Sequence, residues 1–406
     1  MSVPSDGIAR HGRLKRPNPL LGVLRFLGIG VTVLAVSATS IVAIETYRAV
    51  ADIDTVVLHP GEPPAPPPDI AAMQGGFNML IIGSDRGETE EEIKARGKAE
   101  LNDVTMLLHV SQDHTNAVAV SIPRDMVVPI PSCPKADGSG YYPRMSGQPI
   151  NVTLRYGGIP CTVATVEELT GLRIDFAGLI TFQGVIQMST ALGGVPVCLI
   201  EPITDKYSGF SRPAGEFALE GRDALAFLRS RHGVGDGSDL TRISSQQVFL
   251  SSMVRKLKSD DTLHDPLTLF NLASAATTNM TLSDNFRNVD TLMAISKALA
   301  DLDLDKVTFV QYPGVTGQPG IYLKKVKPVA SVAKALFDQI RADKPFALES
   351  AGDGRGSVLN PNATPLPADP DATLDPSAPP AEVLPIIAGL RGQTAADQTC
   401  SAANNG

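Results

Sequence analysis

The sequence lacks the short motifs that mark several common classes of enzyme. It contains no Gly-x-Ser-x-Gly, no phosphate-binding Gly-x-x-x-x-Gly-Lys and no His-Glu-x-x-His, and its six histidines are scattered. The four cysteines show no metal-ligand spacing. These absences argue against serine, cysteine and zinc hydrolases.

The sequence also lacks an excess of basic residues. The formal net charge is −8, whereas proteins that bind the phosphate backbone of nucleic acids need a basic face. We therefore expect no nucleic acid as a partner. A local basic pocket is compatible with this charge.

An apolar segment near the N-terminus predicts a membrane anchor. Residues 26–44 contain no charged side chain, and this length is enough for a helix to cross a bilayer. Basic residues precede it, so we expect residues 1–25 in the cytoplasm and the remainder outside the cell membrane. A cleaved signal peptide is the alternative, since Ser37-Ala38-Thr39-Ser40 faintly resembles a cleavage site.

Composition suggests two unstructured regions around one folded domain. Residues 45–74 include a run of prolines, which predicts a stiff extracytoplasmic spacer. Residues 345–406 are rich in Pro, Ala, Gly, Ser and Asp, which predicts a disordered acidic tail. The folded domain is then expected over residues 75–344.

Within this domain, β-rich runs alternate with segments of helical spacing. We expect strands at residues 78–82, 104–110, 117–122, 195–200 and 306–311. Expected helices cover residues 163–169, 182–192, 221–228, 242–258, 266–277, 289–301 and 329–341. The second and third strands predict an antiparallel hairpin. The sum is a three-layer α-β-α domain, with helices on both faces of a mixed sheet.

Two of the cysteines flank a loop rich in Gly, Pro and Tyr. Cys133 and Cys161 lie at its ends, and an extracytoplasmic location permits a disulfide between them. This pairing is our first choice, although connectivity does not follow from sequence alone. Buried free thiols are the alternative.

Charged residues gather where strands are expected to end. Asp85 and Arg86 follow the first strand, Asp103 begins the next, and Arg124 and Asp125 follow the third. Ligands in α/β sheets bind at strand ends, and two carboxylates there could hold magnesium beside substrate phosphates. Manganese takes the same oxygen ligands.

Two further pairs of polar residues fit a pyrophosphate. Arg229 and Arg231 are two apart, so they would project to one side of an extended segment. Their guanidinium groups match the geometry of phosphate oxygens. Arg242 and Gln246 are four apart and would share a helix face. Each charge alone is typical of a solvated surface, but together they suggest a polyphosphate site.

These residues lie in six ordered motifs that resemble the LytR-CpsA-Psr family. The motifs are Gly83-Ser84-Asp85, Asn102-Asp103-Val104-Thr105-Met106, Ser121-Ile122-Pro123-Arg124-Asp125, Ile150-Asn151 with Tyr156-Gly157-Gly158, Arg229-Ser230-Arg231, and Asp239-Leu240-Thr241-Arg242-Ile243 with Gln246-Gln247. The resemblance is close over residues 75–259 and looser to residue 344. Two positions depart from the family pattern, Leu101 and Ser245, where an arginine is common, so the site would be less basic.

The resemblance implies an envelope phosphotransferase that moves a glycopolymer from a polyprenyl-pyrophosphate-linked donor to peptidoglycan. It implies magnesium ligands at Asp85 and Asp103. It implies pyrophosphate contacts from Arg124, Arg229, Arg231 and Gln246, supported by Arg86, Asp125 and Arg242. The lipid would lie in an apolar tunnel between sheet and helices. Either aspartate could accept the proton of the attacking hydroxyl.

Two other functions remain open at this point. Water could replace the glycan acceptor, which would make the protein a polyprenyl-pyrophosphate phosphatase. The protein could also be a non-catalytic regulator that only binds a lipid-linked envelope glycan, because loss of a guanidinium can remove transition-state stabilisation and leave ground-state binding.

Overall fold

The computed structural model describes residues 54–62, 75–85, 100–135, 137–259, 262, 265–352, 354–363 and 384–404. These residues belong to one compact unit, residues 52–406. Within the described ranges no helix is long and apolar enough to cross a membrane. The predicted anchor at residues 26–44 lies outside these ranges, as does Arg86.

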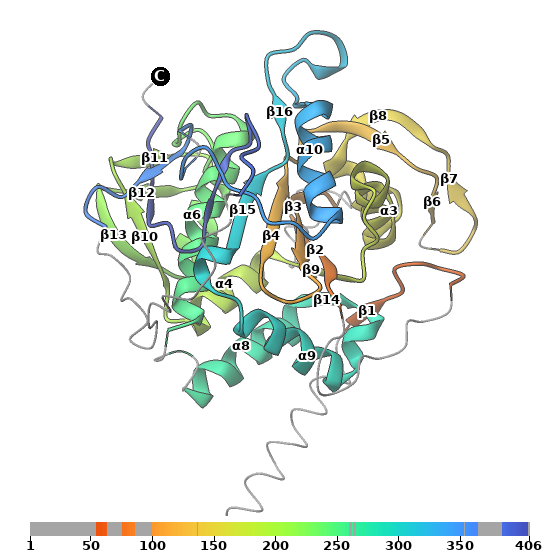
Figure 1. Cartoon of the computed structure of the whole chain (residues 1–406), viewed down its shortest axis with the longest axis horizontal. Coiled ribbons are helices and arrows are strands. Elements are labelled where there is room, and N and C mark those ends of the chain that lie inside the picture. The colour runs from red at the N-terminus through yellow and green to blue at the C-terminus, as the bar shows by residue number, and fades with distance from the viewer. Residues whose placement is uncertain are drawn as a thin grey trace, which may run out of the picture. The chain divides into compact units, whose positions relative to one another are not determined.

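An eight-stranded mixed sheet forms the centre of this unit (Figure 1). In spatial order its strands are β1 (Asp54–Val56), β14 (Met280–Ser283), β9 (Phe176–Ile180), β2 (Phe77–Ser84), β3 (Asn102–Val110), β4 (Ala117–Ile122), β15 (Val307–Gln311) and β19 (Gly392–Thr394). Three neighbouring pairs are parallel, namely β1 with β14, β9 with β2 and β4 with β15. The predicted hairpin is confirmed as β3 and β4, which pair antiparallel.

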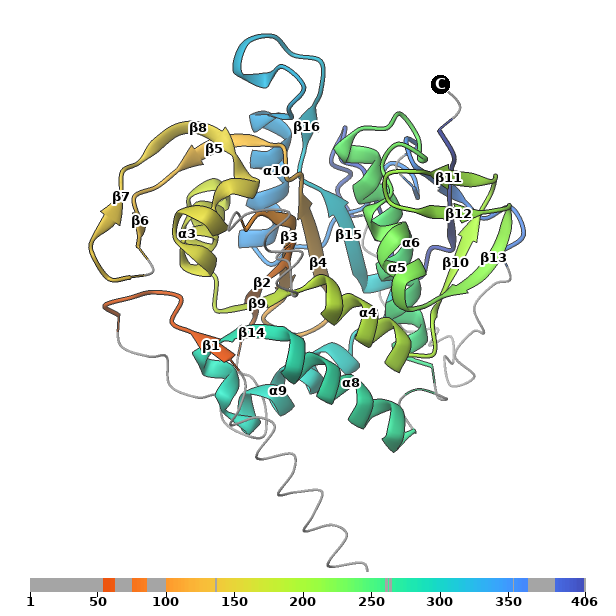
Figure 2. The same cartoon turned by 180° about the vertical axis from the view of Figure 1, so that it is seen from behind.

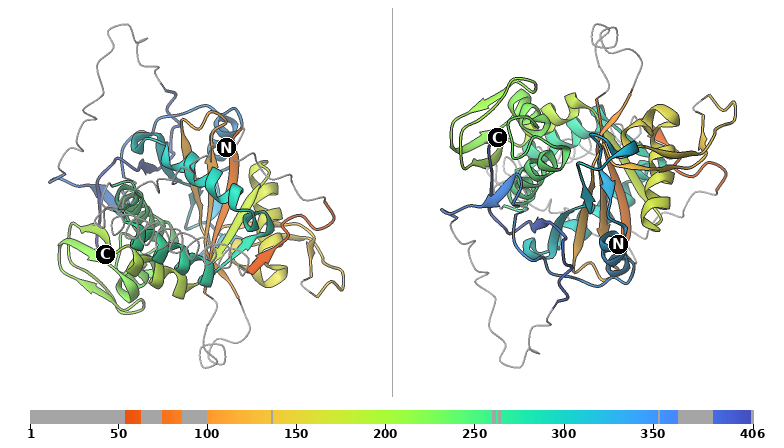
Figure 3. Two further views of the ribbon diagram at one scale, coloured as in Figure 1. Left: turned by 90° about the horizontal axis from the view of Figure 1, so that it is seen from below. Right: turned by 90° about the horizontal axis from the view of Figure 1, so that it is seen from above.

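Helices cover both faces of this sheet. On one face, side chains of α3 (Gly158–Thr170) and α10 (Ala330–Arg341) share a core with Leu80, Leu107 and Val120 of the central strands. On the other face, Gln311 of β15 donates through Nε2 to Leu240 O of α6 (Asp239–Leu257) at 3.1 Å. The edge-on views show α3 and α6 on opposite sides of the sheet (Figure 3).

The remaining helices lie around the α6 side and one end of the sheet. They are α4 (Phe182–Ala191), α5 (Gly221–Arg229), α8 (Pro266–Asn279) and α9 (Val289–Ala300). Seen from behind, α8 and α9 lie at the end opposite the hairpin β16 (Gly314–Val315) and β17 (Lys327–Pro328) (Figure 2). Further hairpins pair β5 (Val127–Ile130) with β8 (Met145–Pro149), and β6 (Cys133–Pro134) with β7 (Tyr141–Tyr142).

A second, four-stranded sheet was not predicted. Its strands in order are β13 (Gly215–Leu219), β10 (Val195–Leu199), β20 (Thr399–Ser401) and β18 (Ser357–Leu359). The expected strand at residues 195–200 is therefore present, but it belongs to this sheet rather than to the central one. A small hairpin, β11 (Ile203–Asp205) and β12 (Phe210–Arg212), follows it.

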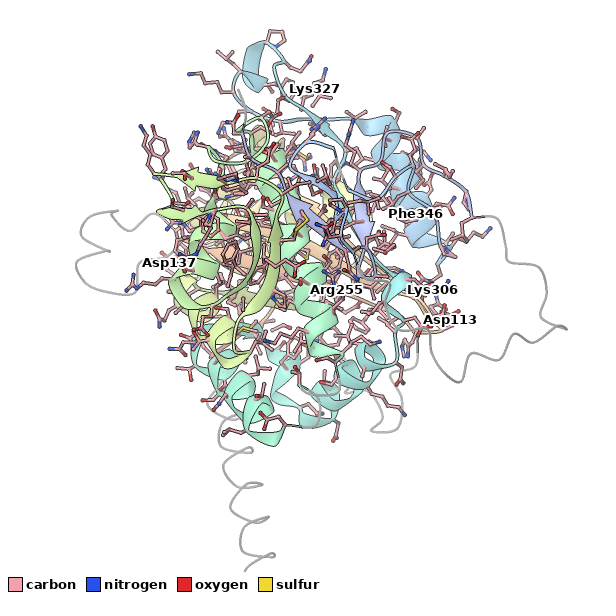
Figure 4. The ribbon with its side chains drawn as sticks, turned by 90° about the vertical axis from the view of Figure 1, so that its left-hand side faces the viewer. Asp113, Asp137, Arg255, Lys306, Lys327 and Phe346 are labelled. Carbon is pink, nitrogen blue, oxygen red and sulfur yellow. A yellow bond between two sulfur atoms is a disulfide. The ribbon has the colours of Figure 1, made fainter. Side chains whose placement is uncertain are left out.

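The prediction of a disordered tail at residues 345–406 is wrong for its described parts, which supply β18, β19 and β20. Buried polar groups there are paired: Gln393 donates to Ser251 Oγ at 2.6 Å. Arg255, labelled in Figure 4, donates to Ala395 O and Asp397 O at 2.7 and 2.9 Å. Composition indicated disorder because few apolar residues are present, but those few include Phe346, Ile387 and Leu390 of the main core, and hydrogen bonds and a disulfide add to their packing.

The predicted spacer at residues 45–74 is wrong in its middle part. Residues Asp54–Val56 form β1, which pairs parallel with β14 in the central sheet. Leu58 is 6% exposed and belongs to the main core. These apolar residues precede the run of prolines, so they are free to pair, whereas residues 63–74 lie outside the described ranges.

Both disulfides of the protein lie in described parts of the chain. Cys133 pairs with Cys161, as expected from the loop between them. Cys198 pairs with Cys400 and joins β10 to β20. The second bond was not foreseen because its C-terminal partner was placed in a disordered tail.

Candidate active site

A tight turn after β4 positions two of the predicted site residues. Met126 N donates to Pro123 O at 2.9 Å, which closes the turn. Asn151 N donates to Arg124 O at 3.1 Å and holds the turn from outside. Proline ends the pairing of the strand, so Arg124 and Asp125 leave the sheet at its edge.

The arginine pair lies where a helix becomes extended. Helix α5 ends at Arg229, and Ser230 is extended, with φ −62° and ψ 130°. Ser230 is fully buried, while Arg229 and Arg231 both line one cavity. The expected common side of the two arginines is therefore observed, with the serine between them pointing away.

Helix α6 contributes the fourth arginine from its first turn. Ser238 caps this helix by accepting from Thr241 N. Arg242 is 4% exposed, and its Nη2 lies 2.8 Å from Asp103 O and 2.7 Å from Asp239 Oδ1. Arg242 thus joins the start of α6 to the start of β3.

These elements enclose a cavity of about 140 Å³. Its lining residues are Asp103, Arg124, Asp205, Tyr207, Ser208, Arg229, Arg231, His232 and Arg242. Four guanidinium groups and two carboxylates therefore share this lining, in a protein of net charge −8. Converging guanidinium forks bind the oxygens of phosphate groups more strongly than isolated charges do.

The arginines are held in place by carboxylates rather than left mobile. Asp103 Oδ1 pairs with Arg124 Nη1, and Arg124 Nε lies 3.7 Å from Asp239 Oδ1 and 3.8 Å from Asp125 Oδ2. Burial acts to lower the pKa of Arg124, but the charges of Asp103 and Asp239 outweigh it and raise that pKa. Arg124 therefore stays charged at any physiological pH.

Sequence analysis missed Asp205, which organises one wall of the cavity. Its Oδ2 accepts from the main-chain N–H groups of Arg231 and His232 at 2.8 and 2.9 Å. Its Oδ1 accepts from Tyr207 N at 2.9 Å. Burial raises the pKa of Asp205, but these N–H donors prevail and lower it to about 2. The signal in sequence was an aspartate three residues before Ser-Gly, a turn pattern between short strands.

Other predicted site residues lie beside the cavity rather than in its lining. Asp125 Oδ1 accepts from Lys325 Nζ at 2.6 Å, and its Oδ2 lies 3.9 Å from Arg231 Nη1. Gln246 is 6% exposed and donates through Nε2 to Leu228 O at 3.1 Å, so it supports the end of α5. Lys325 was also missed, because it comes from the distant β16–β17 hairpin.

The two aspartates predicted as metal ligands lie at the same end of paired strands. Asp85 follows β2 and accepts through Oδ1 from Leu101 N at 3.0 Å, and Asp103 is the second residue of β3. In the described part of the chain no group of three or more acidic, histidine or cysteine side chains is arranged so that it could hold a metal ion. Carboxylate oxygens nevertheless suit Mg²⁺, which uses one or two of them when phosphates supply further ligands.

Comparison with known proteins places this geometry in context. Residues 44–339 match the model of the LytR_cpsA_psr family. The cell wall biosynthesis protein LcpA of Corynebacterium glutamicum is 30% identical over 267 residues, which cover 60% of this chain and 51% of that protein. The polyisoprenyl-teichoic acid–peptidoglycan teichoic acid transferase TagT of Bacillus subtilis is 30% identical over 189 residues, 45% of this chain and 53% of TagT. The chain thus spans about half the length of these curated relatives.

Solved structures support the fold. TagV of B. subtilis superposes with a TM-score of 0.53 at 20% identity, over 67% of this chain and 98% of TagV. A LytR-Csp2A-Psr enzyme from Actinomyces oris superposes with a TM-score of 0.51 at 21% identity, over 71% of this chain and 96% of that one.

Proposed function

The chain belongs to the LytR-CpsA-Psr family, and from this premise we propose that it attaches an envelope glycopolymer to peptidoglycan. The donor is a polyprenyl-pyrophosphate-linked glycopolymer, and the acceptor is a muramic acid hydroxyl. The product is a phosphodiester. The observation that carries this proposal is the cavity where four arginines converge, because a pyrophosphate is the group of the donor that they fit.

The reaction forms one bond and breaks one bond at the sugar-side phosphorus. The acceptor oxygen attacks this phosphorus, the bond to the bridging oxygen breaks, and polyprenyl phosphate leaves with the electron pair. Phosphoryl transfer requires alignment and charge stabilisation more than covalent chemistry. In this proposal Arg124, Arg229 and Arg231 stabilise the negative charge that develops on the phosphate oxygens.

The proton of the acceptor hydroxyl needs a base. Of the two candidate aspartates, Asp103 lines the cavity, so we assign this role to Asp103. Asp85 and Asp103 would together hold magnesium, which when bound neutralises charge on the pyrophosphate. Arg124 pairs with Asp103 and fixes the orientation of that carboxylate.

The α6 face of the sheet offers a place for the lipid. Met79, Ile81 and Leu108 lie on central strands, yet they are only partly buried. Gly83 and Gly178 also lie on this face, since Gly83 pairs with Val104 and Gly178 pairs with Ile81. As glycines they add no side chain to it. In this proposal the isoprenyl chain packs against these partly exposed apolar side chains.

We further propose that the protein acts at the outer surface of the cell membrane. The uncharged segment 26–44 would be its single anchor, with the basic N-terminus in the cytoplasm. Two disulfides in the folded unit fit an oxidising compartment. The lipid-linked donor and peptidoglycan both occur on that side.

The test is turnover of a short-chain isoprenyl-pyrophosphate-linked glycan by the full chain, with peptidoglycan fragments as acceptor, with and without Mg²⁺. We expect transfer that an Arg229→Ala/Arg231→Ala variant loses by at least about 100-fold. Arg144→Ala is the matched control, since Arg144 makes an exposed ion pair with Glu168 away from the cavity. Phosphate release without transfer would identify a phosphatase, and binding without turnover would identify a regulator.

A further inference from the structure

An exposed aromatic side chain lies at the mouth of the arginine cavity. Tyr207 lines this cavity, yet 71% of the residue is exposed to solvent. It is at the tip of the β11–β12 hairpin, which Figure 1 shows beside α6. A single exposed aromatic side chain is ordinary on a protein surface, but this one lines the arginine cavity, where a ligand can reach it.

The ring of Tyr207 packs against the ring of His232. The centroids of Tyr207 and His232 lie 4.6 Å apart with an interplanar angle of 50°. His232 also lines the cavity and directly follows Arg231. The two rings therefore form one aromatic platform next to the guanidinium groups.

The platform is fixed relative to the arginines by a single buried carboxylate. Asp205 accepts from Tyr207 N through Oδ1, and from the N–H groups of Arg231 and His232 through Oδ2. Asp205 itself is 2% exposed. One anion thus holds the backbone of both the hairpin tip and the arginine segment, so the two segments are placed relative to each other before any ligand binds.

The ring already attracts a positively polarised group. Lys206 Nζ lies 5.4 Å from the centroid of Tyr207, as expected for a cation near the negative face of an aromatic ring. Lys206 is exposed. The C–H bonds on the flat face of a pyranose carry the same sign of polarisation, so a sugar ring suits this position.

From these contacts we infer that Tyr207 and His232 form a saccharide subsite that stacks the pyranose ring adjoining the reacting phosphate. This inference rests on the proposed function, because it needs a phosphate in the arginine cavity. The sugar can belong to the donor or to the acceptor glycan. In both cases the subsite binds a pyranose ring that is no more than one sugar unit from the phosphate.

The test compares two ligands of the full chain by calorimetry. One is geranyl pyrophosphate, and the other is the same pyrophosphate carrying one N-acetylglucosamine. We expect the wild type to prefer the second, and Tyr207→Ala to weaken its binding about tenfold while leaving that of geranyl pyrophosphate unchanged. Tyr207→Phe keeps the ring and should bind like the wild type.

A matched control is Tyr141→Ala, since Tyr141 is 64% exposed but lies on the β6–β7 hairpin outside the cavity lining. If Tyr207→Ala leaves donor binding intact but raises the KM for the peptidoglycan acceptor, the stacked sugar is that of the acceptor. Equal weakening of both pyrophosphates, or no change in any of these quantities, overturns the subsite. Sugar-dependent binding without transfer would instead count against the proposed function alone.

Discussion

Asp205 Oδ2 accepts a hydrogen bond from Arg231 N at 2.8 Å, although the two residues are 26 positions apart. The same oxygen accepts from Ser230 Oγ at 3.1 Å and from Gly233 N at 3.3 Å. A buried carboxylate with this many donors fixes the backbone around it. The conformation of the arginine segment therefore depends on a residue that contacts no guanidinium group.

Asp205→Asn should disturb this segment without changing its arginines. The amide keeps one acceptor oxygen and replaces the other with a donor, which leaves several N–H groups without a partner. We expect a loss of about 2 kcal/mol in the free energy of unfolding and a fall in kcat/KM of about tenfold or more. Urea denaturation and transfer kinetics measure the two effects.

Asp223→Asn is the control for this change. Asp223 pairs with Arg212 at the protein surface, where its side chain is 50% exposed, and exposed pairs contribute little. If Asp205→Asn retained wild-type kinetics, Asp205 would stabilise the fold without influence on the activity of the site.

The low pKa of Asp205 predicts that the stability of the protein depends on pH in the acidic range. Its pKa is about 2 in the folded protein against an ordinary 3.8. A depressed folded pKa means that the stabilisation is complete above pH 3.8 and is lost as the pH falls toward 2. The difference in free energy of unfolding between wild type and Asp205→Asn should therefore shrink as the pH falls from about 4 to about 2, as measured by urea denaturation. A difference that stays constant over this range would contradict the assignment.

The sequence was sufficient for four of the eight strands of the central sheet and for the arginines of the cavity, whereas β1, β9, β14 and β19 were not predicted. Hydrophobic period and turn residues located the strands β2, β3, β4 and β15, because burial on both faces leaves long apolar runs. The arginines were identified since their motifs lie at strand and helix ends. Ligand sites at such ends follow from the topology of α/β sheets.

The second sheet and the wall around Asp205 could not be predicted in the same way. Strands β18, β19 and β20 have three residues each, too few to show a period. Their stability comes from the Cys198–Cys400 bond and from polar pairs such as Ser245 Oγ and Ser401 Oγ at 2.9 Å. Such contacts join residues more than 150 positions apart, and no local pattern encodes them. Ser245 thus occupies a buried position against the C-terminal segment.

Lys325 should tune the site through Asp125. Lys325 Nζ lies 2.6 Å from Asp125 Oδ1, while Asp125 Oδ2 is 3.9 Å from Arg231 Nη1. In Lys325→Met, Asp125 loses its ion pair with Lys325. Its negative charge then acts more strongly on Arg231, which weakens the binding of phosphate by that arginine. We expect the KM of the pyrophosphate donor to rise about fivefold, or about 1 kcal/mol, with kcat nearly unchanged.

Lys327→Met provides the comparison, because Lys327 is an exposed residue of the same hairpin whose Nζ lies 5.6 Å from the centroid of Tyr322. A fall in kcat with an unchanged KM for Lys325→Met would mean that Lys325 acts directly in the transition state. That result would remove Asp125 from the explanation.

The two disulfides should differ in their effect on activity. Cys198–Cys400 spans 202 residues and Cys133–Cys161 spans 28, so chain entropy predicts losses of about 5 and about 3.5 kcal/mol when each pair is replaced by serine. Only the Cys198–Cys400 bond holds the C-terminal segment. In this segment Asn404 N donates to Gly233 O at 3.0 Å, in the loop after the arginine pair. The Cys198→Ser/Cys400→Ser variant should therefore lose stability in urea and lose transfer activity under conditions where it remains folded. The Cys133→Ser/Cys161→Ser variant should lose stability but keep its activity. Equal activity of both variants would show that the C-terminal segment does not order the loop after the arginine pair.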